Sequence, residues 1–326
     1  MKFFVRRVIF YLLTAFFAVS LNFFIPRMMP GDPVQAMIVR FQGQMSADAI
    51  NSLRVLFGLD SAAPLWRQYL QYWGQILRGD LGLSFYQFPT PVIDVIKQCL
   101  PWTLLLVGVS TVVAFVIGTA AGTILGWRRG TIADAIIPVT TFFSALPYFW
   151  VALLLIALFG VKLQWLPFFG SYTPGLIPGV NAPFIGSVIK HALLPAITIV
   201  IASMAGWILG MRNLMVTVTS EDYVTVAHAK GLRGVAVMGG YAARNAILPQ
   251  ISGFALSLGF VVGGTLVMEQ VFSYQGIGFM LFRALGAHDY PLMQGIFLII
   301  TLAVLVANII ADVFYAVLDP RVRKEG

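Results

Sequence analysis

Long apolar runs separated by short polar stretches make up most of the chain. About 20 consecutive apolar residues are enough for a helix to cross the hydrocarbon core of a bilayer. Six runs approach or exceed that length, at residues 8–25, 103–126, 134–160, 192–211, 251–272 and 292–316. The pattern therefore predicts an all-α membrane protein with six transmembrane helices.

The polar stretch between the first two runs, residues 26–101, is too long for a simple connection. Two parts of it show helical spacing, one starting with a candidate cap at Ser46 and one from Pro64 to Leu77. We expect a small external helical subdomain here. It either contacts another protein or only stabilises the outer mouth of the membrane region.

A second polar stretch, EDYVTVAHAKGLRGVAVMGGYAARNAILP, lies between the fourth and fifth runs. Ser220 before it is a candidate N-cap, and Glu221 and Asp222 in the first turn complement the helix dipole. Gly231 is suited to end this first helix. The stretch is too short to fold alone, so it is either a docking element for a partner or a helix pair on the membrane surface.

The second half of this stretch predicts another short helix, over about 235–246. We expect it to stop at Pro249, because proline lacks the backbone N–H that a helix interior needs. The whole of 212–249 then consists of two short helices with a glycine corner between them.

Composition supports the membrane assignment. The 326 residues are 59% hydrophobic and only 10% charged, with a mean hydropathy of +0.87, whereas soluble domains carry about 25% charged residues. The net charge of +8 comes from basic residues at the ends of apolar runs, not from a patch interleaved with aromatics. We therefore expect a lipid bilayer, not a nucleic acid, as the surrounding partner.

The distribution of basic residues predicts the orientation of the chain. One set of termini and short connections carries most of them: Lys2, Arg6, Arg7, Arg128, Arg129, Arg212, Lys230, Arg233, Arg244, Arg321, Arg323 and Lys324. The opposite short connections hold only Lys162, Lys190 and Arg283. The positive-inside rule then places both termini, the 128–133 turn and the 212–249 segment in the cytoplasm. The first run lacks a small-residue cleavage site, so we interpret it as a retained anchor.

Small residues in the apolar runs predict close helix packing. Gly118, Gly122 and Gly126 lie one helical turn apart, and Gly206 with Gly210 and Gly259 with Gly263 repeat the spacing. Such spacing lets helix backbones approach each other inside a membrane. Prolines within the runs, at positions 138, 147 and 195, predict kinks or breaks.

Candidates for catalysis or metal binding are few. Cys99 is the single cysteine, and His191, His228 and His288 are far apart, without a ligand-type companion one turn away. The sequence contains no G-x-x-x-x-G-K-[ST] phosphate-binding loop. We expect no catalytic residue, no metal site and no cofactor in this chain.

Three polar residues in the last two runs are candidates for a substrate path, because charged groups inside membranes tend to be functional. Asn308 and Asp312 share one helix face, although Asp312 also lies close to the predicted cytoplasmic end. Glu269 lies near the outer end of the fifth run, as a gate residue or a surface residue.

The 221–249 stretch resembles the cytoplasmic "EAA" loop of ABC importer permeases, in the version of the peptide/nickel permease family. The matching positions are Asp222, Tyr223, Ala227, His228, Ala229, Lys230, Gly231, Leu232, Arg244, Asn245, Ala246 and Pro249. The chain departs from the general form of the motif, since Thr225 occupies the acidic position and Val226 the first alanine.

Other stretches resemble the same family in the same order along the chain. They are MPGDP at 29–33, the segment 57–85 with RGDLG, EQVFSYQGIG at 269–278, DYPLMQG at 289–295 and ADVFYAVLDPRVR at 311–323. The resemblance implies an importer type-I permease fold. In such a fold, 1–25 would be an anchor helix, 102–318 a five-helix core and 319–326 a cytoplasmic tail.

The resemblance also implies partners. A second homologous permease would complete the path, two ATPase subunits with ATP and Mg would dock on 212–249, and an external solute-binding protein would deliver cargo. The protein would be located in the cytoplasmic membrane of a bacterium or archaeon. Dipeptides or oligopeptides are the expected cargo, with oligosaccharides or nickel chelates as alternatives. A self-contained secondary transporter and an intramembrane enzyme are the other classes considered.

Overall fold

A computed structural model describes residues 2–28, 64–263 and 265–318 of the chain. Within these ranges the protein is helical, and the only β-type pairing is an isolated bridge between Leu83 and Pro91. The all-α prediction is confirmed for this part of the chain. The predicted helix starting near Ser46 lies outside the described residues.

The chain divides into two compact units. Unit 1 comprises Met1–Thr103 and Gln275–Leu305, and unit 2 comprises Leu104–Tyr274 and Val306–Gly326.

Unit 1 contains α1 (Lys2–Arg27), α4 (Leu65–Leu77), α5 (Val92–Thr103), α14 (Ile277–Gly286) and the first part of α15 (Tyr290–Leu318). The α4 helix begins directly after Pro64, as the sequence predicted. Its apolar face packs on α1 and α15 through a buried cluster of Val19, Phe23, Tyr72 and Leu298. The packing of that amphipathic face holds α4 in place.

A buried carboxylate connects the turn at 84–86 of unit 1 to the start of α15. Asp289 Oδ1 accepts a hydrogen bond from the Leu292 N–H at 3.0 Å, which makes Asp289 the N-cap of α15. Asp289 Oδ2 accepts from the Ser84 hydroxyl at 2.6 Å and from the Tyr86 N–H at 2.9 Å. Burial raises the pKa of Asp289, and these hydrogen bonds oppose the rise.

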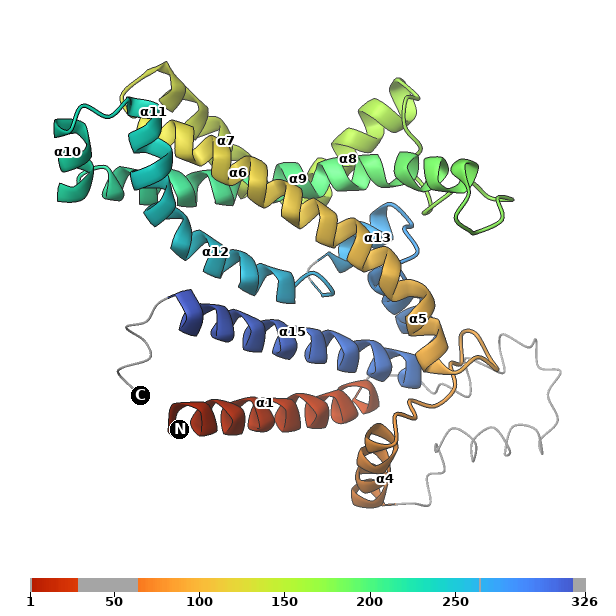
Figure 1. Ribbon diagram of the computed structural model, residues 1–326. Coiled ribbons are helices and arrows are strands. Elements are labelled where there is room, and N and C mark those ends of the chain that lie inside the picture. Colours follow the sequence, from red (N-terminus) through yellow and green to blue (C-terminus); the bar gives the residue numbers. More distant parts are fainter. Residues whose placement is uncertain (1, 29–63, 264, 319–326) are drawn as a thin grey trace. The chain divides into compact units, whose positions relative to one another are not determined.

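Unit 2 is built around α6 (Val109–Trp127) and α9 (Ala182–Val218), which pack along each other more extensively than any other described pair (Figure 1). The predicted glycine spacing explains this approach. A Cβ added at Gly118 would lie 2.6 Å from Trp207 Cβ, and one at Gly122 would lie 2.5 Å from the Ile208 carbonyl oxygen. Gly206 does not follow the prediction, since a Cβ there would meet nothing within 4 Å.

The third apolar run is not one straight helix. It forms α7 (Ile136–Ala145) and α8 (Tyr148–Leu155), which continues as the π-helix η3 (Ile156–Lys162), with a bend of 101° at the break. Leu146 at the break is extended, with ψ 133°. The ring of a proline clashes with the preceding residue when that residue is helical, so the residue before a proline is usually extended. The break predicted at Pro147 is therefore confirmed.

The fifth apolar run is interrupted as well. The α12 helix (Arg244–Gly259) ends eight residues after Ile251, and α13 (Leu266–Val271) is a separate short helix. Four helices in the described residues are long and apolar enough to cross a membrane, or five if the bent α7–α8 pair counts as one span. The four match the first, second, fourth and sixth predicted runs, and a total of six spans stays a prediction.

Candidate functional site

The polar segment after α9 forms the predicted first helix, α10 (Asp222–Ala229). The predicted cap at Ser220 is wrong. Glu221 holds the N-cap position without a side-chain hydrogen bond. The Ser220 hydroxyl instead donates to the Thr217 carbonyl at 2.7 Å, because the chain is still turning out of α9 at that point.

The predicted glycine corner ends α10. Gly231 has φ +75°, a left-handed conformation that glycine adopts without steric cost. The Gly231 N–H donates to the His228 carbonyl at 2.9 Å, and the Leu232 N–H donates to the Ala227 carbonyl at 3.4 Å. This pair of bonds is the Schellman arrangement, and it satisfies carbonyls that a helix end leaves unpaired.

The second helical piece differs from its prediction at the C-terminal end. It starts as α11 (Gly234–Val237), widens into the π-helix η4 (Met238–Ala243) and continues directly into α12. Pro249 therefore lies inside a helix, and the predicted stop there is wrong. The buried residues Ala246 and Gln250 hold the helix on both sides of the proline, so packing outweighs the cost of about 3 kcal/mol for an interior proline.

The buried side of α10 is joined to the membrane helices of unit 2. Val224 and Ala227 are 2% and 1% exposed and pack in one cluster with Met211 and Met215 of α9. The same cluster includes Val237, Ala242 and Ala246, from the helices that follow. In addition, the Trp127 ring at the end of α6 stacks on His228, with ring centroids 5.9 Å apart. A displacement of α10 must therefore act on α6, α9 and α12 together.

The other side of this segment is exposed and carries large apolar side chains. Val226 is 51% exposed and Val235 is 77% exposed, and Tyr223, Leu232 and Tyr241 are also exposed. Of the residues predicted as a coupling site, only Ala227 is buried. The others lie at the surface: Glu221, Asp222, Tyr223, Ala229, Lys230, Gly231, Leu232, Arg244, Asn245 and Pro249. We call the exposed face of 221–241 the docking face.

The predicted path residues have different environments. Glu269 is 1% exposed in α13, so its interpretation as a surface residue is wrong. The pKa of Tyr274 is raised by the burial of the Tyr274 side chain itself and, to a smaller extent, by the negative charge of Glu269. Asn308 and Asp312 are both half-buried, one turn apart on α15.

Unit 2 contains a cavity that the sequence reasoning missed. Its volume is about 510 Å³, and it is lined by residues of α6, α9 and α12 together with Val107, Phe260, Val261 and Thr265. The lining combines apolar groups with five polar side chains: Thr111, Ser203, Gln250, Ser257 and Thr265. Neither Glu269 nor Asn308 nor Asp312 lines it.

Glycines contribute to the shape of this cavity. Gly206 leaves open space at the wall, and Gly210 leaves room for the Gln250 amide, which an added Cβ would displace. Trp207 lines the same wall. The available signal was the small and polar series Ser203, Gly206 and Gly210 on α9. Helix packing motifs use the same residue types, so this signal alone does not reveal a cavity.

The described residues contain no group of three or more histidine, cysteine or carboxylate side chains that could hold a metal ion. His191 is buried in α9, with Nδ1 2.8 Å from the Ser187 carbonyl oxygen. Together, the long apolar helices and the partly polar cavity between them are typical of a membrane transport component.

Residues 118–324 match the family described as "binding-protein-dependent transport system inner membrane component", and the chain belongs to that family. It is therefore a permease subunit of an ABC transporter and not an enzyme.

Three curated relatives cover nearly the whole chain. The oligopeptide transport system permease protein AppB of Bacillus subtilis (strain 168) is 35% identical, over 93% of each chain. The di/tripeptide transport system permease protein DppB of Pseudomonas aeruginosa (strain UCBPP-PA14) is 34% identical over 99% of each. The glutathione transport system permease protein GsiC of Escherichia coli (strain K12) is 32% identical over 98% of each.

Proposed function

We propose that this chain is one of two homologous permease subunits in an ATP-driven importer of peptides. The observation that carries this proposal is the docking face, an exposed surface with apolar and charged side chains on a helix whose other side is packed into α9 and α12. An ATP-driven permease without its own phosphate-binding loop requires such a surface, because the energy of ATP must enter through contact with another protein.

Two ATPase subunits, carrying ATP and Mg, dock on the 212–249 segment of the two permeases. Exposed Val226 and Val235 supply apolar contact, and Lys230, Arg233 and Arg244 supply positive charge around it. When the ATPases close, α10 moves with them and transmits the motion to the membrane helices through the Val224 and Ala227 contacts. Rigid-body rocking of this kind is a common basis of alternating access.

The 510 Å³ cavity of unit 2 is our candidate for this chain's share of the translocation path. Its threonine, serine and glutamine side chains can exchange hydrogen bonds with a peptide backbone, while its apolar wall tolerates varied side chains. The five-helix core of 102–318 would hold this path, with Glu269, Asn308 and Asp312 as further candidates.

The orientation follows from the basic residues, with both termini and the docking face in the cytoplasm. A solute-binding protein delivers the cargo from the opposite side, near the 26–101 segment. Peptides are preferred over oligosaccharides and nickel chelates, because the named relatives transport oligopeptides, di/tripeptides and glutathione.

The test uses two variants in cells that contain the native partner subunits. Val226→Asp places a charge on the docking face, because Val226 is 51% exposed and is not a member of the buried cluster. Ile132→Asp places the same charge on another exposed apolar residue, 92% exposed, at the same predicted side of the membrane. We expect Val226→Asp to abolish both ATPase recovery on affinity purification and uptake of a labelled peptide. Ile132→Asp should retain both.

Gly231→Pro provides a second test, since proline cannot adopt φ +75°. It should uncouple ATP hydrolysis from uptake. Normal uptake by Val226→Asp and Gly231→Pro proteins, present at wild-type levels in the membrane, would exclude the docking role and favour a self-contained transporter.

A further inference from the structure

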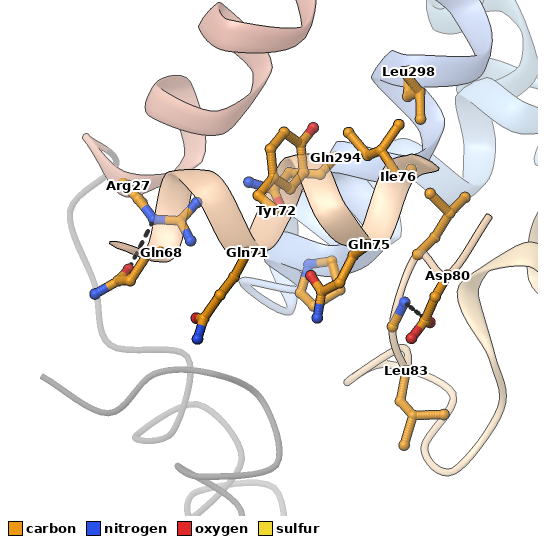
Figure 2. A pocket seen from close by; sticks show the side chains of 14 residues that line it. Arg27, Gln68, Gln71, Tyr72, Gln75, Ile76, Asp80, Leu83, Gln294 and Leu298 are labelled. Carbon is orange, nitrogen blue, oxygen red and sulfur yellow. Dashed lines mark hydrogen bonds between the residues drawn. The ribbon is translucent and has the colours of Figure 1, made fainter. Parts of the chain in front are cut away.

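A polar cleft lies within unit 1, between the end of α1, the α4 helix with the turn after it and the start of α15 (Figure 2). Its volume is about 130 Å³, room for on the order of ten water-sized groups. Most of its polar side chains are neutral carboxamides, and its two charged side chains have opposite sign. None of the functions proposed above uses this cleft.

The carboxamides form a row along α4. Gln68, Gln71 and Gln75 follow each other at intervals of three and four residues, so they share one helix face. At 1.5 Å per residue, the row is about 10 Å long. Each carboxamide can both donate and accept hydrogen bonds. The row is thus suited to a ligand that alternates N–H and C=O groups and whose side chains need not be recognised.

The two charges lie at opposite ends of this row. Figure 2 shows Arg27 beside Gln68 and Asp80 beyond Gln75. The Arg27 guanidinium lies over the Phe23 ring at 3.7 Å and donates from Nη1 to the Phe23 carbonyl oxygen at 2.9 Å, which holds it in place. Arg27 Nε also donates to the Gln68 Oε1 at 3.5 Å. A guanidinium has five N–H donors, so it can still bind a carboxylate through two of the others.

Asp80 is positioned by its own turn. Its Oδ1 accepts from the Gly82 N–H at 2.9 Å, and the side chain is exposed at the cleft. An ionised carboxylate accepts about four hydrogen bonds, so Asp80 retains the capacity to bind an ammonium group. The cleft therefore offers a cation at one end, an anion at the other and amides between them.

We propose that this cleft binds a short peptide with free termini, its carboxylate at Arg27, its ammonium at Asp80 and its backbone along the glutamine row. An extended peptide rises about 3.4 Å per residue, so the row of about 10 Å fits two or three residues. The proposal rests on the proposed function for its cargo class and for its orientation, which places the end of α1 and hence the cleft on the outer side.

Other ligands match this arrangement less well. A neutral oligosaccharide has no charged ends to pair with Arg27 and Asp80. A phosphatidylethanolamine headgroup has both charges, but only two carbons join its phosphate to its ammonium. Its charges are therefore closer together than the two ends of the glutamine row.

The experiment measures peptide binding to the full-length chain in lipid nanodiscs by calorimetry. The ligands are trialanine, its N-acetyl form, its C-terminal amide and the doubly blocked form. Blocking either terminus should weaken binding about ten- to hundredfold, the worth of a hydrogen bond to a charged group. Arg27→Gln should weaken trialanine binding by a similar factor and remove the further loss caused by amidation. Asp80→Asn should also weaken trialanine binding, and it should remove the further loss caused by acetylation.

Matched controls separate recognition from folding. Arg27→Lys keeps the charge and should keep most of the affinity. Arg78→Gln and Asp94→Asn remove charges of the same signs outside the cleft, from an exposed and a half-exposed side chain, and should bind trialanine like the wild type.

Equal binding of trialanine and its doubly blocked form would overturn the proposal. So would binding of glycerophosphoethanolamine, but not trialanine, with the same sensitivity to Arg27→Gln. Uptake of trialanine by the complete transporter distinguishes the two proposals. Uptake without binding to this chain refutes the cleft alone, whereas terminus-dependent binding without uptake supports the cleft and refutes the importer cargo.

Discussion

Replacing Gly122 by alanine tests whether the contact between α6 and α9 depends on bare backbone. The added Cβ would lie 2.5 Å from the Ile208 carbonyl oxygen, 2.8 Å from Met211 Cβ and 3.1 Å from the Arg212 nitrogen. Ordinary heavy-atom contacts of carbon start at about 3.5 Å, so the helices would have to separate locally by about 1 Å. The glycines one turn away on each side make equally close contacts, which resist that shift.

The expected change in the free energy of unfolding is the difference between two opposing effects. Overpacking of this kind costs about 1–3 kcal/mol, while alanine gains up to about 1 kcal/mol over glycine in a helix. Because backbone atoms are among the clashing groups, we expect Gly122→Ala to lower the free energy of unfolding by about 2 kcal/mol. For a chain of 326 residues, that corresponds to a decrease in melting temperature of about 3 °C, at an unfolding entropy of about 2.1 cal/mol/K per residue.

Thermal unfolding of the purified protein in detergent, followed by loss of the monodisperse peak, measures the effect. Gly186→Ala is the matched control, because Gly186 lies in α9 and an added Cβ there meets nothing within 4 Å. That control should melt at or slightly above the wild-type temperature. Equal melting temperatures for the two variants would refute the role of Gly122 in helix packing.

Two further predictions concern unit 1. Asp289→Ala removes the cap of α15 and the acceptor of the Ser84 hydroxyl, so the free energy of unfolding should fall by about 2–4 kcal/mol. The control is Asp94→Ala, which removes a half-exposed carboxylate and its ion pair with Lys97; equal melting temperatures for the two variants would contradict this prediction. Burial raises the pKa of Tyr72 to about 12, above the ordinary value of about 10. The unfolded chain then loses the Tyr72 proton at a lower pH than the folded chain does. The contribution of buried, neutral Tyr72 to the free energy of unfolding is therefore complete below about pH 10 and is lost as the pH rises toward 12. Melting curves between pH 9 and 12 should fall less steeply for Tyr72→Phe than for the wild type, and parallel curves would disprove the assignment.

The local features of this protein were predictable from the sequence. The α4 helix was expected from Pro64 to Leu77 and is found at Leu65–Leu77. The glycine corner at Gly231 and the close contacts at Gly118 and Gly122 were also expected. These features depend on neighbouring residues or on one turn of helix, where a short pattern contains all the information that the physics requires.

Where a local signal competed with packing, the sequence misled. Pro249 signals a helix end, but buried Ala246 and Gln250 keep the helix continuous. Ser220 has the chemistry of a cap, but the end of α9 already determines its hydrogen bond. The sequence placed Glu269 in the fifth apolar run but did not decide whether its side chain is buried or at the surface. The fold buries it.

The sequence by itself determined that the chain is helical and apolar enough for a membrane, where four of its long apolar helices lie and that a short polar helix follows the fourth run. Only the tertiary structure decided that the fifth run is broken and that a cavity opens beside Gly206. The same holds for the meeting of Arg27, the α4 glutamines and Asp80 in one cleft. Hydrophobic periodicity reports which face of a helix is apolar, but the identity of the facing helix depends on contacts between residues far apart in the chain.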